Sequence, residues 1–206
     1  MFVPSISKDE LHKLPVGQFT GQIHLIEDIA GINHVCKNLA KQTILGFDTE
    51  TKPSFKKGNS NRVSLLQLAT SNEAYLFRLH KTGIPEVLIN ILSDPAILKI
   101  GIAIHDDIRH LLTLSNFKPE GFVELQHFVK EYGIENSGLS KLAGIILNFR
   151  ISKSQQLSNW ENEILTEAQK TYAATDAWAA CEIYKTLNTV PKPDLTNNDK
   201  NNTEIR

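Results

Sequence analysis

Apolar residues recur along the chain with two different spacings, and each spacing predicts one kind of element. Short apolar runs next to turn residues predict strands. These cover residues 44–50, 63–69, 74–79, 97–102 and, more briefly, 123–125. Apolar residues three and four positions apart predict helices instead. These cover residues 27–40, 84–92, 107–114, 125–132, 139–147 and 167–187.

The order of these elements indicates the fold class. The link at Ser71-Asn72 is so short that it favours an antiparallel pair, which extends to a three-strand meander with strand 44–50. Strands followed by a mixture of strands and helices predict an α/β fold, a mixed five-stranded sheet flanked by helices. Ligands of such sheets lie near strand ends. Thr166 and Gln169 form a predicted capping box at the start of the last helix.

Residues 21–190 form the predicted folded domain. We expect residues 1–20 to be a loosely ordered lead-in. Residues 191–206 contain mostly Asn, Asp, Lys, Thr and Pro, and this composition predicts a disordered tail. Cys36 and Cys181 have no metal-type spacing and are expected to be buried thiols.

The bulk properties exclude two classes of protein. The net charge is −1, whereas a non-specific nucleic-acid coat protein is usually strongly basic, so any nucleic-acid contact must be local. No apolar run approaches the ~20 residues of a membrane span, and the N-terminus lacks the pattern of a signal peptide. A cytoplasmic protein without membrane contact is the expectation.

Acidic residues recur in three local settings. Asp48 and Glu50 end a predicted strand, and because side chains alternate along a strand, both point to the same face while Thr49 points to the other. Tyr172 and Asp176 lie one turn apart on a helix face. Asp107 lies at the predicted start of a helix within the segment KIGIAIHDDIRHLL. Two metals held by such carboxylates are a common means of cleaving phosphodiester bonds.

Each setting also has a structural interpretation. Asp-Thr-Glu is equally typical of a strand that runs into a solvated acidic loop. The Tyr172 helix is rich in alanine, and its tyrosine suits a packed core. Either Asp106 or Asp107 could simply favour the positive end of a helix. The three motifs therefore indicate a metal site only in combination.

In combination they resemble the DEDD 3′–5′ exonucleases, in the subgroup with a catalytic tyrosine. GFDTE with NRVSLLQLAT is similar to the first family motif, KIGIAIHDDIRHLL to the second, and SNWE followed by YAATDA to the third. The similarity runs from about residue 44 to residue 184. Gly101 and Leu111-Leu112 align Asp107, rather than Asp106, with the family aspartate.

The resemblance implies a ribonuclease H-like fold that binds two divalent cations, Mg²⁺ or Mn²⁺. On this mapping Asp48 would bridge both cations, and Glu50 and Asp176 would complete the site that activates water. Asp107 would help to hold the second cation, and Tyr172 would orient the attacking water. The implied partner is single-stranded or 3′-recessed DNA or RNA.

Candidate substrate-binding residues are less specific. They are Thr49, Lys52, Arg62, Lys153, Asn159 and Trp160. Solvated loop lysines and a core tryptophan are the alternatives. The leading hypothesis is a 3′–5′ exonuclease that releases nucleoside 5′-monophosphates. The alternatives are a catalytically silent binding or scaffold module of the same fold and another nuclease of the ribonuclease H-like group.

Overall fold

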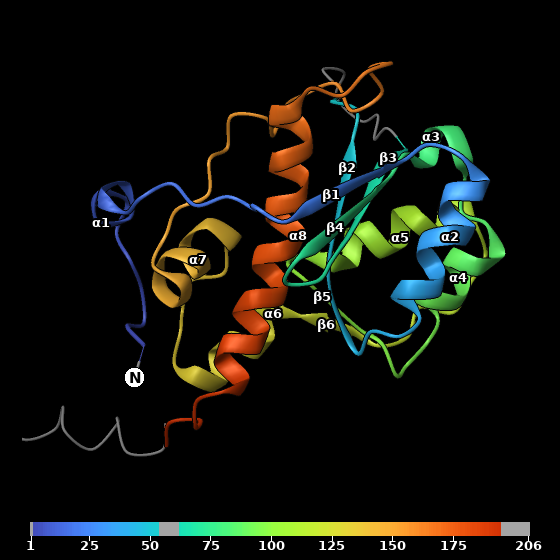
Figure 1. Cartoon of the computed structure of the whole chain (residues 1–206). Coiled ribbons are helices and arrows are strands. Elements are labelled where there is room, and N and C mark those ends of the chain that lie inside the picture. The colour runs from blue at the N-terminus through green and yellow to red at the C-terminus, as the bar shows by residue number, and fades with distance from the viewer. Residues whose placement is uncertain (1, 54–61, 195–206) are drawn as a thin grey trace, which may run out of the picture.

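A six-stranded mixed sheet forms the centre of the molecule in the computed structural model, which describes residues 2–53 and 62–194 (Figure 1). The strand order across the sheet is β1-β4-β3-β2-β5-β6. The strands are β1 (Gln22–Ile26), β2 (Ile44–Thr51), β3 (Val63–Ala69), β4 (Glu73–Phe77), β5 (Leu98–Gly101) and β6 (Phe122–Glu124). The predicted α/β class and the antiparallel meander β2-β3-β4 are confirmed.

The predicted number of five strands is wrong by one. The additional strand, β1, pairs in parallel with β4 at the edge of the sheet. Its sequence, QIHLI, is only five residues long, and so short an apolar run does not by itself distinguish a strand from a helix. The pairs β2-β5 and β5-β6 are also parallel, so the sheet is mixed.

The other regular elements of the described chain are helices. They are α1 (Lys8–Lys13), α2 (Ile29–Leu39), α3 (Leu79–Thr82), α4 (Glu86–Leu92), α5 (Ile104–Leu114), α6 (Leu125–Phe128), the 3₁₀ helix η1 (Val129–Tyr132), α7 (Leu139–Leu147) and α8 (Glu167–Asn188). The capping box of Thr166 and Gln169 is present at the start of α8. No helix in the described part of the chain combines the length and apolar character that a membrane crossing requires.

The described part of the predicted lead-in, residues 2–20, is more regular than the sequence suggested. It contains α1, which begins with a capping box of Ser7 and Glu10. Val16 then forms a parallel bridge with Arg150. At the other end of the chain, most of the predicted disordered tail, residues 195–206, lies outside the described residues.

The two faces of the sheet bury different sets of side chains. Leu45 and Phe47 of β2 join the core beneath α2, α4 and α5. The intervening residues of β2 face α8, whose alanines pack with Leu65 of β3 and Trp160. Figure 1 shows α8 crossing the sheet on one side and α2 and α5 on the other. Alternation along β2 thus separates an apolar face from the face that carries Asp48 and Glu50.

The contact between α8 and β2 is unusually close because of two small residues. A Cβ atom added to Gly46 would lie 1.8 Å from the carbonyl oxygen of Ala177. Both residues are fully buried, so neither backbone can move away without displacing its neighbours. Because Ala177 follows Asp176 directly, this contact fixes the distance of that carboxylate from β2.

We predict that Gly46→Ala destabilises the protein by about 2 kcal/mol or more, since the added methyl group must push α8 away from the sheet. Thermal unfolding measures this effect. Gly138→Ala is the control, because a Cβ at Gly138 meets no atom within 4 Å. Equal melting temperatures for the two variants would contradict the constraint assigned to Gly46.

Candidate active site

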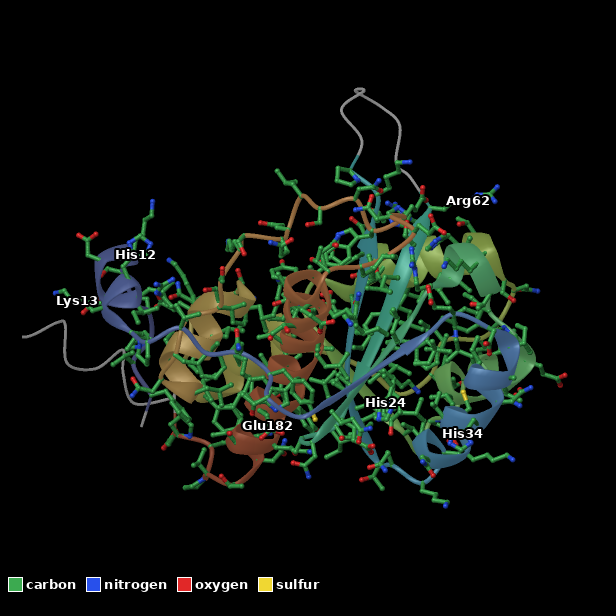
Figure 2. The ribbon with its side chains drawn as sticks, turned by 45° about the horizontal axis from the view of Figure 1, so that its top comes forward. His12, Lys13, His24, His34, Arg62 and Glu182 are labelled. Atoms are coloured by element: carbon green, nitrogen blue, oxygen red, sulfur yellow. The ribbon has the colours of Figure 1, made fainter. Side chains whose placement is uncertain are left out.

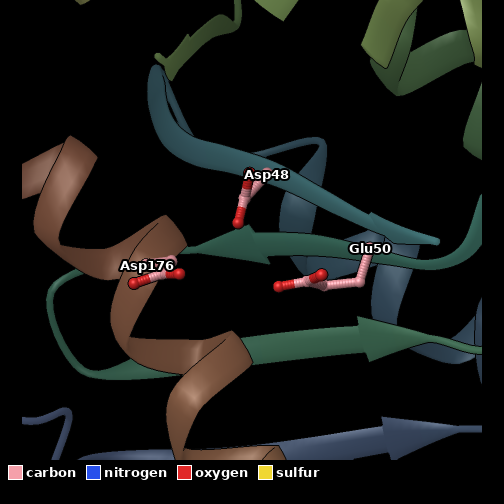
Figure 3. A group of neighbouring side chains, drawn as sticks. All are labelled: Asp48, Glu50 and Asp176. Carbon is pink, nitrogen blue, oxygen red and sulfur yellow. The ribbon is translucent and has the colours of Figure 1, made fainter. Parts of the chain in front are cut away.

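Three carboxylates converge between β2 and α8. Asp48, Glu50 and Asp176 each place a ligand oxygen within 4.8 Å of those of the other two. Figure 3 shows the side chains of Asp48 and Glu50 extending from the strand toward Asp176 on the helix. The predicted shared face of Asp48 and Glu50 is therefore confirmed.

Tyr172 lies one turn before Asp176 on α8, where a separation of four residues places both on the same helix face. Its hydroxyl interacts with the Asp176 carboxylate, and this interaction lowers the pKa of Asp176. The Tyr172 ring lies 6.1 Å from the ring of Trp160, centroid to centroid. The tyrosine is thus held by packing on one side and by a carboxylate on the other.

Burial and mutual repulsion raise the pKa values of the cluster. Desolvation raises the pKa of Glu50 to about 8, with Asp176 and Asp107 adding to the effect. Desolvation also raises the pKa of Asp176 to about 7, against the opposing effects of Tyr172 and Lys153. Asp48 has its pKa raised well above the ordinary value, because it is desolvated and faces the other three carboxylates. Such a cluster favours protons or cations at its centre.

Asp107 joins this electrostatic group from α5. It raises the pKa values of Asp48 and Glu50, and its carboxylate accepts a hydrogen bond from the Thr49 hydroxyl. Asp106, in contrast, is exposed and pairs with Arg109 at 3.1 Å. The choice of Asp107 over Asp106 thus agrees with the geometry.

The start of α5 differs from the prediction. The helix begins at Ile104 rather than at Asp107, after Ala103 in a left-handed conformation with φ 55°. No side chain of the preceding segment caps it. Instead the Glu124 carboxylate, at the end of β6, accepts hydrogen bonds from the backbone N–H groups of Ala103 at 3.0 Å and Ile104 at 2.9 Å. Sequence analysis could not find this cap, because Glu124 is 20 positions away from the helix start.

The segment between α7 and α8 is held by buried polar contacts. Arg78, fully buried, donates hydrogen bonds to the carbonyl oxygens of Glu163, at 2.7 Å, and of Asn162. Its charge is paired with Glu27 at 2.9 Å. This arginine was not identified from the sequence, where it lies far from the residues that it holds.

The three uncharged candidates for substrate binding all lie buried or make contacts within the protein. Trp160 is fully buried, which favours the alternative of a core tryptophan over a substrate contact. The indole N–H of Trp160 lowers the pKa of Glu50. It forms no hydrogen bond of normal geometry among the described residues. The Asn159 side chain binds Asn162 at 2.8 Å. Thr49 donates to Asp107, as described above.

The three basic candidates differ in position. Lys153 lines a cleft of about 820 Å³ together with Tyr172 and Asp176. Lys52 pairs with Glu161 at 3.1 Å. Arg62 is exposed at the start of β3 (Figure 2) and does not line this cleft. A role of these three residues in substrate binding stays a prediction, and the geometry favours Lys153.

The donor set of the cluster fits a divalent cation. Carboxylate oxygens are the ligands that Mg²⁺ and Mn²⁺ prefer, and three of them meet here at ligand spacing. Desolvation first, and the neighbouring carboxylates second, raise the pKa values of Asp48 and Glu50, so a cation among these groups is favoured. Asp48, Glu50 and Asp176 would hold the cation, whereas Asp107 is not part of this group at ligand spacing and acts on it electrostatically.

The fold and this cluster define the class of protein, an α/β domain with an acidic centre suited to cation-assisted phosphate chemistry. The family follows from direct comparison. Residues 23–191 match a family model described as 3′-5′ exonuclease, and the chain belongs to this family. The resemblance to the DEDD exonucleases noted from the motifs is thereby confirmed.

Similar curated proteins carry the same description. The chain is 33% identical over 184 residues to the bifunctional 3′-5′ exonuclease/ATP-dependent helicase WRN of Mus musculus, a match that covers 84% of this chain and 13% of that protein. It is 37% identical over 153 residues to the exonuclease 3′-5′ domain-containing protein 2 of Mus musculus, covering 68% and 23%. The chain thus spans less than a quarter of these two relatives.

Solved structures agree in fold. The Nibbler EXO domain of Aedes aegypti superposes with a TM-score of 0.75 at 25% identity, covering 84% of this chain and 92% of that one. Escherichia coli RNase D superposes with a TM-score of 0.74 at 22% identity, covering 82% and 44%. The ribonuclease H-like architecture expected from the motifs is confirmed by these matches.

We predict that the cation-free protein becomes less stable as pH rises from about 4 to about 8. In this range the folded state keeps protons on Glu50 and Asp176, whose pKa values are raised to about 8 and about 7, while the unfolded chain has released them. Glu50→Gln should reduce this fall in the free energy of unfolding. Thermal unfolding in chelator at a series of pH values measures this difference. A change of 1 kcal/mol shifts the melting temperature by about 2–4 °C.

Glu86→Gln, which removes an exposed carboxylate on α4, is the charge-matched control and should follow the wild type. Mg²⁺ or Mn²⁺ should raise the melting temperature more at high pH than at low pH, because cations bind the deprotonated carboxylates. A Glu50→Gln variant with the same pH profile as the wild type would contradict the raised pKa assigned to Glu50.

Proposed function

We propose that this chain is a metal-dependent 3′–5′ exonuclease, which hydrolyses the terminal phosphodiester bond of a nucleic-acid 3′ end and releases a nucleoside 5′-monophosphate. The convergence of Asp48, Glu50 and Asp176 within 4.8 Å carries this proposal. Membership of the 3′-5′ exonuclease family supports it. The cofactors are two divalent cations, Mg²⁺ or Mn²⁺, and the substrate is single-stranded or 3′-recessed DNA or RNA.

The reaction requires a water oxygen to attack phosphorus as the bond from phosphorus to the 3′ oxygen of the preceding nucleotide breaks. Divalent cations at a carboxylate site lower the pKa of a water and stabilise the leaving oxygen. In this proposal, Asp48, Glu50 and Asp176 would hold the cations at the reaction centre. The 3′ oxygen takes up a proton as it leaves, so a new 3′ hydroxyl remains on the strand.

Tyr172 has an orienting role in this proposal. Desolvation, together with the carboxylates around it, raises the pKa of its hydroxyl above the ordinary value, so this hydroxyl keeps its proton at neutral pH. It therefore donates a hydrogen bond rather than acting as a general base. In this proposal the hydroxyl, which lies beside Asp176 in the cleft, donates that bond to the attacking water.

The rival function is a silent binding or scaffold module of the same fold. Loss of catalysis in such a module is expected when a carboxylate is missing or displaced. Here Asp48, Glu50, Asp107 and Asp176 are all present and interact electrostatically, and Tyr172 contacts the last of them. This arrangement favours the enzyme.

The proposed activity predicts a ladder of products that shortens from the 3′ end. DNA and RNA oligomers labelled at the 5′ end should give this ladder with Mg²⁺ or Mn²⁺, and no product with a chelator. Oligomers labelled at the 3′ end should release mononucleotide first. Asp48→Asn is the inactive control. Fragments cut internally, or binding without cleavage under all conditions, would contradict the proposal.

We predict that Tyr172→Phe lowers the single-turnover rate by about 10²-fold, which corresponds to the loss of a polar catalytic contact. The ring packing against Trp160 remains, so the melting temperature should change little. Stabilisation by Mn²⁺ should also persist, whereas Asp176→Asn should lose both activity and most of that stabilisation. A fully active Tyr172→Phe variant would exclude the orienting role.

A further inference from the structure

The cleft beside Tyr172 and Asp176 extends to α1, a helix that precedes the family-matched part of the chain. Residues Lys8, Leu11 and His12 of α1 line this cleft, whereas the family match begins at residue 23. Figure 1 shows α1 beside α7, on the far side of α8 from α2 and α4. The wall formed by α1 therefore lies outside the residues that match the family model.

Several contacts fix α1 in this position. On its N-terminal side, the backbone N–H of Ile6 donates to the Asn136 side chain at 2.9 Å. On its C-terminal side, Pro15 and Gly17 form backbone hydrogen bonds with Arg150, at 2.9 and 3.0 Å. These contacts tie both ends of the segment to the remainder of the protein.

The apolar side of α1 packs on α7. A Cβ added to Gly144 would lie 2.7 Å from Leu11 Cδ1, 3.3 Å from Leu14 Cδ1 and 3.5 Å from Ile6 Cδ1. Because Gly144 has no side chain, these three residues can pack directly against α7. Both the hydrogen bonds and this packing hold α1 as a fixed wall of the cleft.

One face of α1 points into the cleft. Lys8, Leu11 and His12 are separated by three and four positions, the spacing of one helix face. Lys13 is not among the residues that line the cleft, and Figure 2 shows its side chain directed away from the remainder of the molecule. The two lysines of α1 therefore have different surroundings and can be compared directly.

The charge of the lining is strongly one-sided. The basic residues that line the cleft are Lys8, His12, Lys141, Arg150 and Lys153. Asp176, at the catalytic end, is the one acidic residue among the described residues that line it. Lys8, Lys141 and Lys153 form no ion pair with any acidic residue in the described ranges. We call this lining the basic cleft.

We propose that the basic cleft binds the sugar–phosphate backbone of a single strand behind its 3′ end, with α1 as one wall and Lys8 and His12 as phosphate contacts. This inference rests on the proposed function, because it assumes that the strand ends at Asp176. The basic groups lie in one cleft that leads to one acidic centre, which suits one backbone rather than the two of a duplex.

Lys8→Glu tests this proposal, with Lys13→Glu as the matched control on the same helix. Binding of a labelled single strand of about 12 nucleotides, measured by fluorescence anisotropy in chelator, should weaken roughly 3- to 10-fold for Lys8→Glu. The slope of log K against log salt should fall by about 0.7 for each lost phosphate contact. Lys13→Glu should bind within about twofold of the wild type.

The helix dipole separates binding from stability in this pair. Lys8 lies in the first turn of α1, where glutamate is favourable, whereas Lys13 lies in the last turn, where glutamate is unfavourable. Weaker binding by the variant whose helix is stabilised therefore reports a lost contact rather than unfolding. Melting temperatures of both variants check this point.

Equal affinities of Lys8→Glu and Lys13→Glu would overturn the proposal, as would tighter binding of a blunt duplex than of the single strand. These outcomes are independent of catalysis, because the assay contains chelator. A protein that binds as expected but never cleaves in Mn²⁺ would refute the proposed exonuclease and leave the basic cleft in place. A protein that cleaves but shows no difference between the two variants would refute the basic cleft alone.

Discussion

The approach of α8 to β2 at Gly46 and Ala177 is the constraint on which the remainder of the site depends. A strand and a helix meet here with no side chain between them. Asp48 and Glu50 follow Gly46 by two and four positions, on the same strand face, and Asp176 directly precedes Ala177. The small residues that permit the contact are thus sequence neighbours of the carboxylates that it brings together. A bulkier residue at Gly46 would separate the two halves of the cluster.

The same contact explains the electrostatic state of the cluster. Close packing removes water from Asp48 and Asp176, and desolvation is the largest cause of their raised pKa values. Carboxylates left in water at the same spacing would repel one another less, because the solvent screens them. Deprotonation of the cluster is therefore unfavourable in the cation-free protein, and a bound cation would offset this cost. Tight packing and cation affinity have a single structural origin.

Local patterns in the sequence were sufficient where an element depends on its own residues. The alternation around Asp48 and Glu50, and the capping box of α8, are of this kind, and both are confirmed. Contacts between distant residues could not be found this way, such as the Glu124 cap of α5. Trp160 illustrates the same limit, because its motif does not reveal whether the ring is buried. The α1 helix was not predicted, although Ser7 and Glu10 form a capping box that is visible in the sequence.

The charge balance of the chain conceals a separation that matters for function. A net charge of −1 excludes a generally basic surface, but it does not describe how charges are distributed. Acidic groups concentrate where β2 meets α8, and basic groups line the adjoining cleft between α1, α7 and residues 150–153. A polyanion is repelled by the first region unless cations are present, and is attracted by the second. On the proposed function, a nucleic acid would enter along the basic cleft, and cations at the carboxylates would offset their repulsion of its phosphates. Elements outside the family-matched residues, such as α1, can extend this cleft without altering the carboxylate cluster, because their contacts are to α7 and Arg150 rather than to β2.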